Sequence, residues 1–259
     1  MKLIGGQDFE DLGGTVTSPI ENREGVGHTW NIILDNLKRL IISSLLCALG
    51  FLPLATGIFF GFALRLPPLL LLAGVIGGAI SGPAYGTMID GILVAFRGLP
   101  GRWWERYTQV FRREWKNCLL PGMVQGLFLA MAVNVLMMVY DGRGLPPLML
   151  LSLLVAALTL LAVNTWFWPQ RMQIDLNLIQ LAKNSLLMTM MHPKVTWGAV
   201  AVLILYWAFI FILYPYSSLF LVVLGFWFPS LMQITITYRM LNGELKIEER
   251  LEEKAMDHN

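Results

Sequence analysis

The sequence predicts an all-α fold, that of a polytopic membrane protein. Of its 259 residues, 56% are hydrophobic and 14% are charged, whereas about 25% of the residues of a typical soluble domain are charged. Five long stretches contain no Asp, Glu, Lys or Arg: residues 40–64, 66–89, 117–140, 144–170 and 195–238. Each exceeds the ~18 apolar residues that indicate a membrane span. A soluble globular enzyme and a disulfide-stapled secreted domain are therefore excluded.

Six transmembrane helices are predicted, because a segment of roughly 20 apolar residues can cross about 30 Å of hydrocarbon. The last uncharged stretch is long enough for two helices, and Pro215 divides it. The predicted spans are 40–64, 69–96, 118–140, 146–168, 195–214 and 218–238. Around them, 1–35 is predicted as a polar cytoplasmic arm, 36–240 as the transmembrane domain and 241–259 as a charged cytoplasmic tail.

The distribution of Lys and Arg predicts the orientation of these spans. All of the 19 basic residues except Arg65 and Arg143 fall on one side of the predicted membrane. Positive charges are favoured on the cytoplasmic side, and the number of predicted spans is even. Both termini are therefore expected in the cytoplasm, with the protein as a multi-pass protein of the inner (plasma) membrane.

Short motifs recur along the chain and predict three helix-pair units. A Lys-Asn pair precedes an outward helix at Lys116 and again at Lys183. Pro83, Pro169 and Pro229 lie in the returning helices, each followed within a few residues by a methionine. Recurrence at this spacing is typical of a repeated structural unit. The alternative is chance similarity between apolar segments of biased composition.

The segment between the second and third predicted spans mixes basic and aromatic residues. Its members are Arg102, Trp103, Trp104, Arg106, Arg112, Arg113 and Trp115. This pattern is typical of a helix lying in the membrane interface, where it can recognise anionic lipid or dock a protein partner. The alternative is a basic loop that only sets the topology.

Several of these residues also carry a resemblance to a known family. The segments Gly82–Ala84, Arg97-Gly98, Trp104–Arg112 and Lys116-Asn117 are together similar to the YesL-like family of bacterial integral membrane proteins of unknown function. The resemblance implies a compact multi-helix membrane protein that serves carbohydrate uptake beside ABC-type transporter components. The chain departs from the family pattern in its longer first hairpin and its polar amino-terminal arm. The family supplies no catalytic residue.

The second predicted span carries a glycine at every fourth position. The series is Gly74, Gly78, Gly82 and Gly86, and Pro83 lies within it. Small residues at this spacing allow two helix backbones to approach closely in lipid, and proline is expected to bend the helix. We therefore predict that this helix is the central, most tightly packed one. Access for a ligand along the glycine groove is the alternative.

Four polar side chains are predicted at a similar depth near the cytoplasmic side: Asp90, Gln125, Asn164 and Gln233. An ionisable residue within a membrane usually faces the bundle interior or a water-filled cavity. One interpretation is an inner polar vestibule in which Asp90 binds a proton, a cation or a sugar hydroxyl. The alternatives are interhelical hydrogen bonding and a position of Asp90 at the headgroup boundary.

Enzyme and cofactor signatures are absent from the sequence. The three histidines are too separated to predict a metal site, and neither an HExxH motif nor a phosphate-binding loop occurs. We expect no enzymatic activity, no cofactor, no metal and, at a net charge of +2, no nucleic-acid partner. Two functions stay open: a transport-associated accessory or small permease-like component of solute uptake, and a scaffold or regulator that binds a partner or lipid through its basic face.

Overall fold

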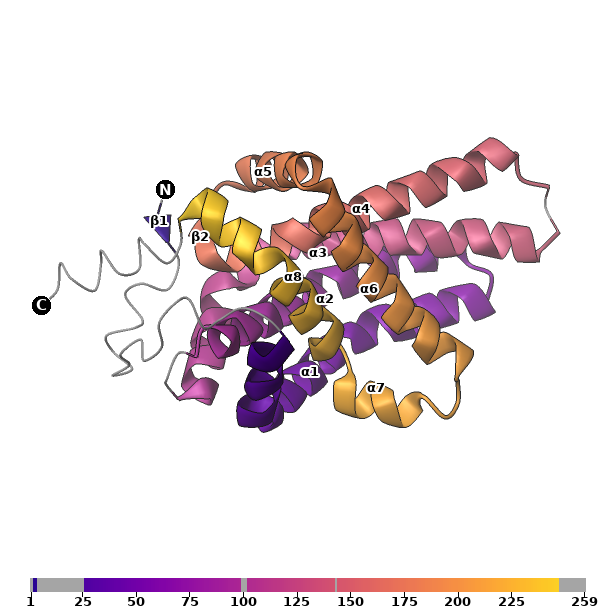
Figure 1. Cartoon of the computed structure of the whole chain (residues 1–259). Helices are drawn as coiled ribbons and strands as arrows, with labels where there is room; N and C mark the ends of the chain where they lie inside the picture. Colours follow the sequence, from indigo (N-terminus) through magenta and orange to yellow (C-terminus); the bar gives the residue numbers. More distant parts are fainter. Residues whose placement is uncertain (1, 4–25, 99–101, 143, 247–259) are drawn as a thin grey trace, which may run out of the picture. The chain divides into compact units, whose positions relative to one another are not determined.

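The computed structural model describes residues 2–3, 26–98, 102–142 and 144–246 (Figure 1). The architecture is helical, which confirms the predicted all-α class. The helices are α1 (Val26–Ala63), α2 (Pro67–Phe96), α3 (Trp103–Tyr140), α4 (Pro147–Gln173), α5 (Leu178–Met191), α6 (Pro193–Ile212), α7 (Ser218–Leu224) and α8 (Trp227–Leu245). Two short strands, β1 (Lys2–Leu3) and β2 (Ile174–Asp175), pair antiparallel.

Within the described ranges, five helices are long and apolar enough to cross a membrane: α1, α2, α3, α4 and α6. Three of them, α2, α4 and α6, begin at a proline, which suits the first helical position because proline has no N–H to leave unpaired. Large apolar side chains are exposed along these helices; Phe211 and Ile212 on α6 are 75% and 79% exposed. Lipid tails, unlike water, solvate such surface favourably. These features indicate a membrane protein.

The sixth predicted span is not one continuous helix. α7 ends at Leu224, Gly225 adopts a φ of +40°, and α8 begins at Trp227. Glycine tolerates this left-handed backbone because it has no Cβ. α8 is not among the helices long and apolar enough to cross a membrane, and its sequence includes Gln233, Arg239 and Glu244. A count of six spans is therefore not confirmed.

Two of the predicted boundaries also differ from the structure. α1 begins at Val26, inside the predicted arm, and α3 begins at Trp103 rather than at residue 118. Lys38 and Arg39 before the first predicted span, and the segment from Trp103 onward before the third, therefore belong to the same helices as those spans. The sequence reading placed the boundaries where charges end, but charged residues are good helix formers and do not interrupt a helix.

The chain forms two compact units, and each is described separately. The first unit comprises Met1–Ser44, Ile89–Arg106 and Leu161–Asn259, and the second comprises Leu45–Met88 and Tyr107–Leu160. The division passes through α1, α2, α3 and α4, so each of these helices contributes one segment to each unit. The predicted grouping into three helix pairs stays a prediction.

In the second unit, α2 and α3 meet backbone to backbone at glycines. A Cβ added to Gly74 would lie 2.7 Å from the carbonyl oxygen of Gly126, and a Cβ on Gly78 would clash with the carbonyl oxygen of Gly122. Gly82 faces the backbone of Cys118 and Gly122 in the same way, and Gly86 is buried. On the α1 side, Gly77 contacts Leu54. α2 is also the most buried of the five long helices. In its most apolar 18-residue stretch, 61% is buried, against 28% or less in the corresponding stretches of the other four.

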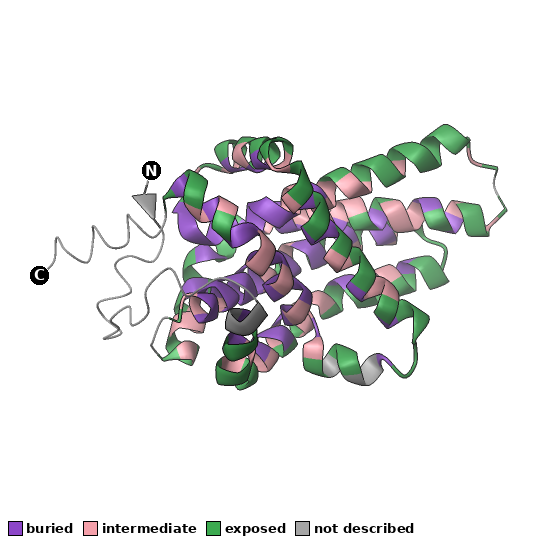
Figure 2. Cartoon of the chain, viewed as in Figure 1, coloured by how far each residue is buried: buried purple, intermediate pink, exposed green. Residues whose placement is uncertain are grey.

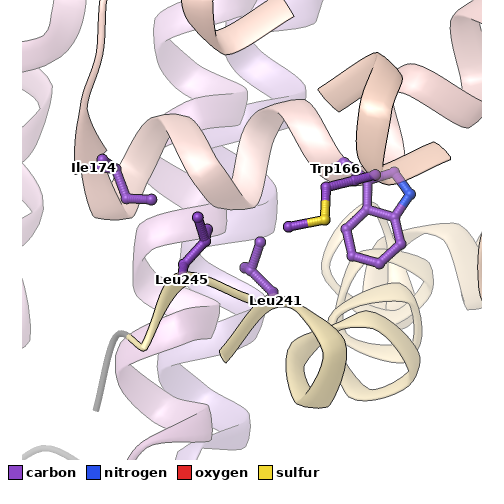
Figure 3. Packing of buried hydrophobic residues seen from close by; sticks show 5 residues of the cluster. Trp166, Ile174, Leu241 and Leu245 are labelled. Carbon is purple, nitrogen blue, oxygen red and sulfur yellow. The ribbon is translucent and has the colours of Figure 1, made fainter. Parts of the chain in front are cut away.

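In the first unit, the apolar core lies where the end of α4 meets α5 and α8. It consists of Trp166, Ile174, Met188, Leu241 and Leu245, and Figure 3 shows Trp166 and Ile174 with Leu241 and Leu245 of α8 between them. Buried positions dominate α8, whereas α5 is largely exposed (Figure 2). Trp166 also donates a hydrogen bond from Nε1 to Oγ1 of Thr196 on α6, at 2.9 Å. This core holds the last turns of α4 in place.

Candidate functional site

Asp90, the predicted centre of a polar vestibule, forms an ion pair in the first unit. It lies near the end of α2 and accepts two hydrogen bonds from Arg106 on α3, with Nε–Oδ2 at 3.0 Å and Nη2–Oδ1 at 3.2 Å. The side chains of Asp90 and Arg106 are only 8% and 15% exposed. Such a two-pronged arrangement is the strong form of a carboxylate–guanidinium contact. The charge of Asp90 is therefore already compensated in this conformation.

The other three predicted vestibule residues are distributed over both units. Gln233 on α8 is 9% exposed, and Asn164 on α4 is half-buried; both belong to the first unit, as Asp90 does. Gln125 on α3 belongs to the second unit. A vestibule shared by all four side chains stays a prediction.

The basic and aromatic residues of the predicted interfacial segment are mostly exposed. Trp104 and Trp115 are 56% and 44% exposed on α3, and Trp103, which packs against Trp104, is half-buried. Arg102 pairs with Glu105 at 2.9 Å in an exposed contact. Arg112 and Arg113 are also exposed, and Arg113 donates to Glu114 at 3.1 Å. Arg106 differs from Arg102 and Arg113 because its ion pair, with Asp90, is mostly buried.

A second polar group in the first unit was not singled out by sequence reasoning. Arg97, just after α2, donates from Nε to the hydroxyl of Tyr238 on α8 at 2.9 Å. Its Nη2 donates to Oε1 of Gln173 on α4 at 2.7 Å, and the guanidinium also lies 5.6 Å from the centre of the Tyr238 ring. All of these contacts are with uncharged groups. We refer to Arg97, Gln170, Gln173 and Tyr238 as the arginine–glutamine cluster.

Gln170 completes this cluster one helical turn before Gln173. It is 0% exposed, and in the described part of the chain neither its Nε2 nor its Oε1 has a hydrogen-bond partner. Residues three and four apart share a helix face, so Gln170 lies on the same side of α4 as Trp166 and Gln173. A buried polar group without a partner is costly.

The end of α4 is buried on all sides, polar residues included. Every residue from Thr165 to Gln173 is buried, and Arg171 is only 2% exposed, with its Nη1 donating to the carbonyl oxygen of Leu176 at 3.1 Å. The charge distribution predicts Arg171 on the cytoplasmic side, but it does not predict that the side chain is buried. One sequence feature could have indicated this burial: Pro169-Gln170-Arg171 follows directly after the aromatic residues Trp166–Trp168. Large aromatic side chains can cover the polar side chains next to them.

The described residues contain no group of three or more His, Cys, Asp or Glu side chains that could hold a metal ion. The arginine–glutamine cluster offers one guanidinium, two amides and the Tyr238 hydroxyl, groups that can hydrogen-bond an oxygen-rich ligand. No protein-family model matches the chain, and it matches neither a curated protein nor a solved structure.

Proposed function

We propose that this chain is a transport-associated membrane protein, an accessory subunit or small permease-like component of solute uptake in the inner membrane. The observation that supports it most is the arginine–glutamine cluster. The two glutamines are buried and the arginine is half-buried, just beyond the predicted cytoplasmic ends of the second and fourth spans, where a solute pathway would open. The residues of the cluster lie just after α2, on α4 and on α8. The hydrogen bonds of the positively charged Arg97 go to the uncharged side chains of Gln173 and Tyr238.

The YesL-like resemblance points to the same role, with carbohydrate as the solute class and ABC-type transporter components as partners. The chain carries no phosphate-binding loop, so ATP-driven uptake would require a second protein to hydrolyse the nucleotide. The basic residues on the predicted cytoplasmic side would lie where such a subunit docks.

The experiment is an uptake assay in cells that lack the native gene and express variants of equal abundance. Arg97→Gln should reduce uptake of the transported solute at least tenfold, because the positive charge of the cluster is lost. Arg102→Gln is the matched control: Arg102 is exposed and pairs only in a surface contact with Glu105, so uptake should be unchanged. Equal uptake by wild type, Arg97→Gln and a strain without the protein would contradict a transport role.

A scaffold or regulator is the second candidate, and the exposed face of α3 favours it. Trp104, Phe111 and Trp115 are exposed at intervals of seven and four residues, with Arg112 beside them. This is the composition of a surface that binds anionic lipid or a partner helix. Purification in mild detergent separates the two: a Trp104→Ala/Trp115→Ala variant that loses bound protein or lipid but keeps full uptake would favour a scaffold role for this face.

A further inference from the structure

One exposed face of α3 carries two basic side chains that have no acidic partner. Arg112 and Lys116 are both exposed, and residues four apart share a helix face. In the described part of the chain, no Asp or Glu side chain pairs with either of them. The Lys116 ammonium instead lies 5.9 Å from the centre of the Trp115 ring, and Trp115 is 44% exposed. This face therefore presents two positive charges and an indole to its surroundings.

The nearest carboxylate in the sequence is turned away from this face. Glu114 is 5% exposed. It accepts a hydrogen bond from Nε of Arg113 at 3.1 Å and another from Nδ2 of Asn117 at 3.1 Å. Because Glu114 is buried and already paired, it does not neutralise Arg112 or Lys116. The ligand that complements the exposed face is therefore an anion, which a guanidinium and an ammonium bind most strongly.

The position of this face along α3 indicates where that anion lies. α3 has 38 residues, so it is about 57 Å long, whereas the hydrocarbon core of a bilayer is about 30 Å thick. The uncharged part of the helix begins at Asn117, directly after Lys116. Arg112 and Lys116 are therefore expected where the helix leaves the hydrocarbon, at the level of the phospholipid headgroups on the predicted cytoplasmic side.

The same face continues toward the uncharged part of α3 as an apolar surface. Leu119 and Leu120 follow Lys116 by three and four residues; Leu119 is half-buried and Leu120 is 54% exposed. The order along the helix is thus basic, aromatic and apolar, and indole rings favour the headgroup zone between water and hydrocarbon. A phospholipid has the same order in its phosphate, glycerol and acyl chain. A free anion would use only the basic part of this surface.

We infer that Arg112, Trp115 and Lys116 bind one anionic phospholipid of the cytoplasmic leaflet. The headgroup phosphate accepts hydrogen bonds from the Arg112 guanidinium and the Lys116 ammonium. The glycerol region lies against Trp115, and an acyl chain lies along Leu119 and Leu120. This inference names the ligand of the α3 face on which the second candidate function is based, and it rests on that candidate only for a regulatory role. Binding itself requires neither transport nor a protein partner.

The test measures phospholipid binding to the full-length protein, purified in detergent, by native mass spectrometry. Phosphatidylglycerol, which is anionic, and phosphatidylcholine, which is zwitterionic, are titrated separately with identical acyl chains. Each basic residue near an anionic membrane surface contributes roughly fivefold in affinity, so wild type should bind phosphatidylglycerol at least tenfold more tightly. Inorganic phosphate in large excess should not displace this lipid, because it has no acyl chain to contact the leucines.

The Arg112→Gln/Lys116→Gln variant distinguishes a defined site from a general attraction between lipid and a basic protein. Its preference for phosphatidylglycerol should fall below about threefold, because both charges are lost. Both side chains are exposed, so its unfolding temperature should stay close to that of wild type. Lys38→Gln/Arg39→Gln is the matched control: it removes two exposed basic residues directly before the first predicted span, on α1. This control should keep the tenfold preference.

Three results would overturn the inference. They are equal affinity of wild type for the two phospholipids, an equal loss of the preference in both double variants, and displacement of phosphatidylglycerol by inorganic phosphate. The uptake assay with Arg97→Gln tests the transport role on a different helix end and with a different measurement. Failure of the transport proposal would therefore leave the lipid site standing, and failure of the lipid site would leave the transport proposal standing.

Discussion

At the residue scale, the ion pair between Asp90 and Arg106 changes what substitution of Asp90 is expected to do. A free vestibule carboxylate would tolerate asparagine, which keeps the size of the side chain. In the structure both carboxylate oxygens are engaged by a guanidinium that is itself mostly buried. Removing one partner of such a pair leaves the other charge uncompensated, which is the main source of destabilisation.

We expect Asp90→Asn to lower stability in detergent by roughly 1–3 kcal/mol, because Arg106 loses its counter-charge. Arg106→Gln should do the same, and the double variant should be less destabilised than the sum of the two single changes. Thermal unfolding of wild type, the two single variants and the double variant measures this coupling.

Glu105→Gln is the control, since it breaks only the exposed pair with Arg102 and should cost less than ~1 kcal/mol. Additive effects at Asp90 and Arg106 would contradict the pairing.

At the element scale, α2 and α3 approach closely in the second unit because glycines from both helices lie in the contact. Gly78 and Gly82 on α2 meet Gly122 on α3 with no room for a Cβ. In a bilayer no hydrophobic effect holds helices together, so close van der Waals contact between backbones is a major source of association. The periodic spacing on α2 was visible in the sequence; the partners Gly122 and Gly126 became visible only when the two helices were placed together.

Replacing glycine by alanine should therefore have opposite effects at Gly78 on α2 and at Gly198 on α6. Gly78→Ala should lower the unfolding temperature, because the added methyl would overlap the carbonyl oxygen of Gly122, a strain of about 1–3 kcal/mol. Gly198→Ala on α6 should raise it slightly, because a Cβ there meets nothing within 4 Å and alanine favours a helix by up to ~1 kcal/mol. Detergent unfolding of both variants is the measurement. Stabilisation by both substitutions would contradict tight α2–α3 packing.

At the scale of the whole molecule, the orientation of the chain is a prediction from charge alone. It can be tested by adding single cysteines for a membrane-impermeant reagent. Tyr216→Cys and Gly144→Cys should be labelled from outside intact cells, and Gly243→Cys should be labelled only after the cells are opened. The native Cys47 and Cys118 give a low background because they are 0% and 1% exposed. The reverse labelling pattern would overturn the orientation.

The sequence by itself determined the membrane class and the helical fold. Long apolar stretches need no tertiary partner to be recognised, since in lipid every backbone polar group must be satisfied within a helix. The periodic glycines on α2 were equally visible, because helical spacing is a local property.

Only the tertiary structure decided where charge and polarity are buried. It paired Asp90 with Arg106, divided the last predicted span at Gly225, and buried Gln170 and Arg171 at the end of α4. It also gave Arg97 partners that are distant in sequence: Gln173 meets it from 76 positions away, and Tyr238 from 141. Composition and hydropathy describe what a residue prefers, but long-range packing decides which neighbour it obtains, and that neighbour sets its chemistry.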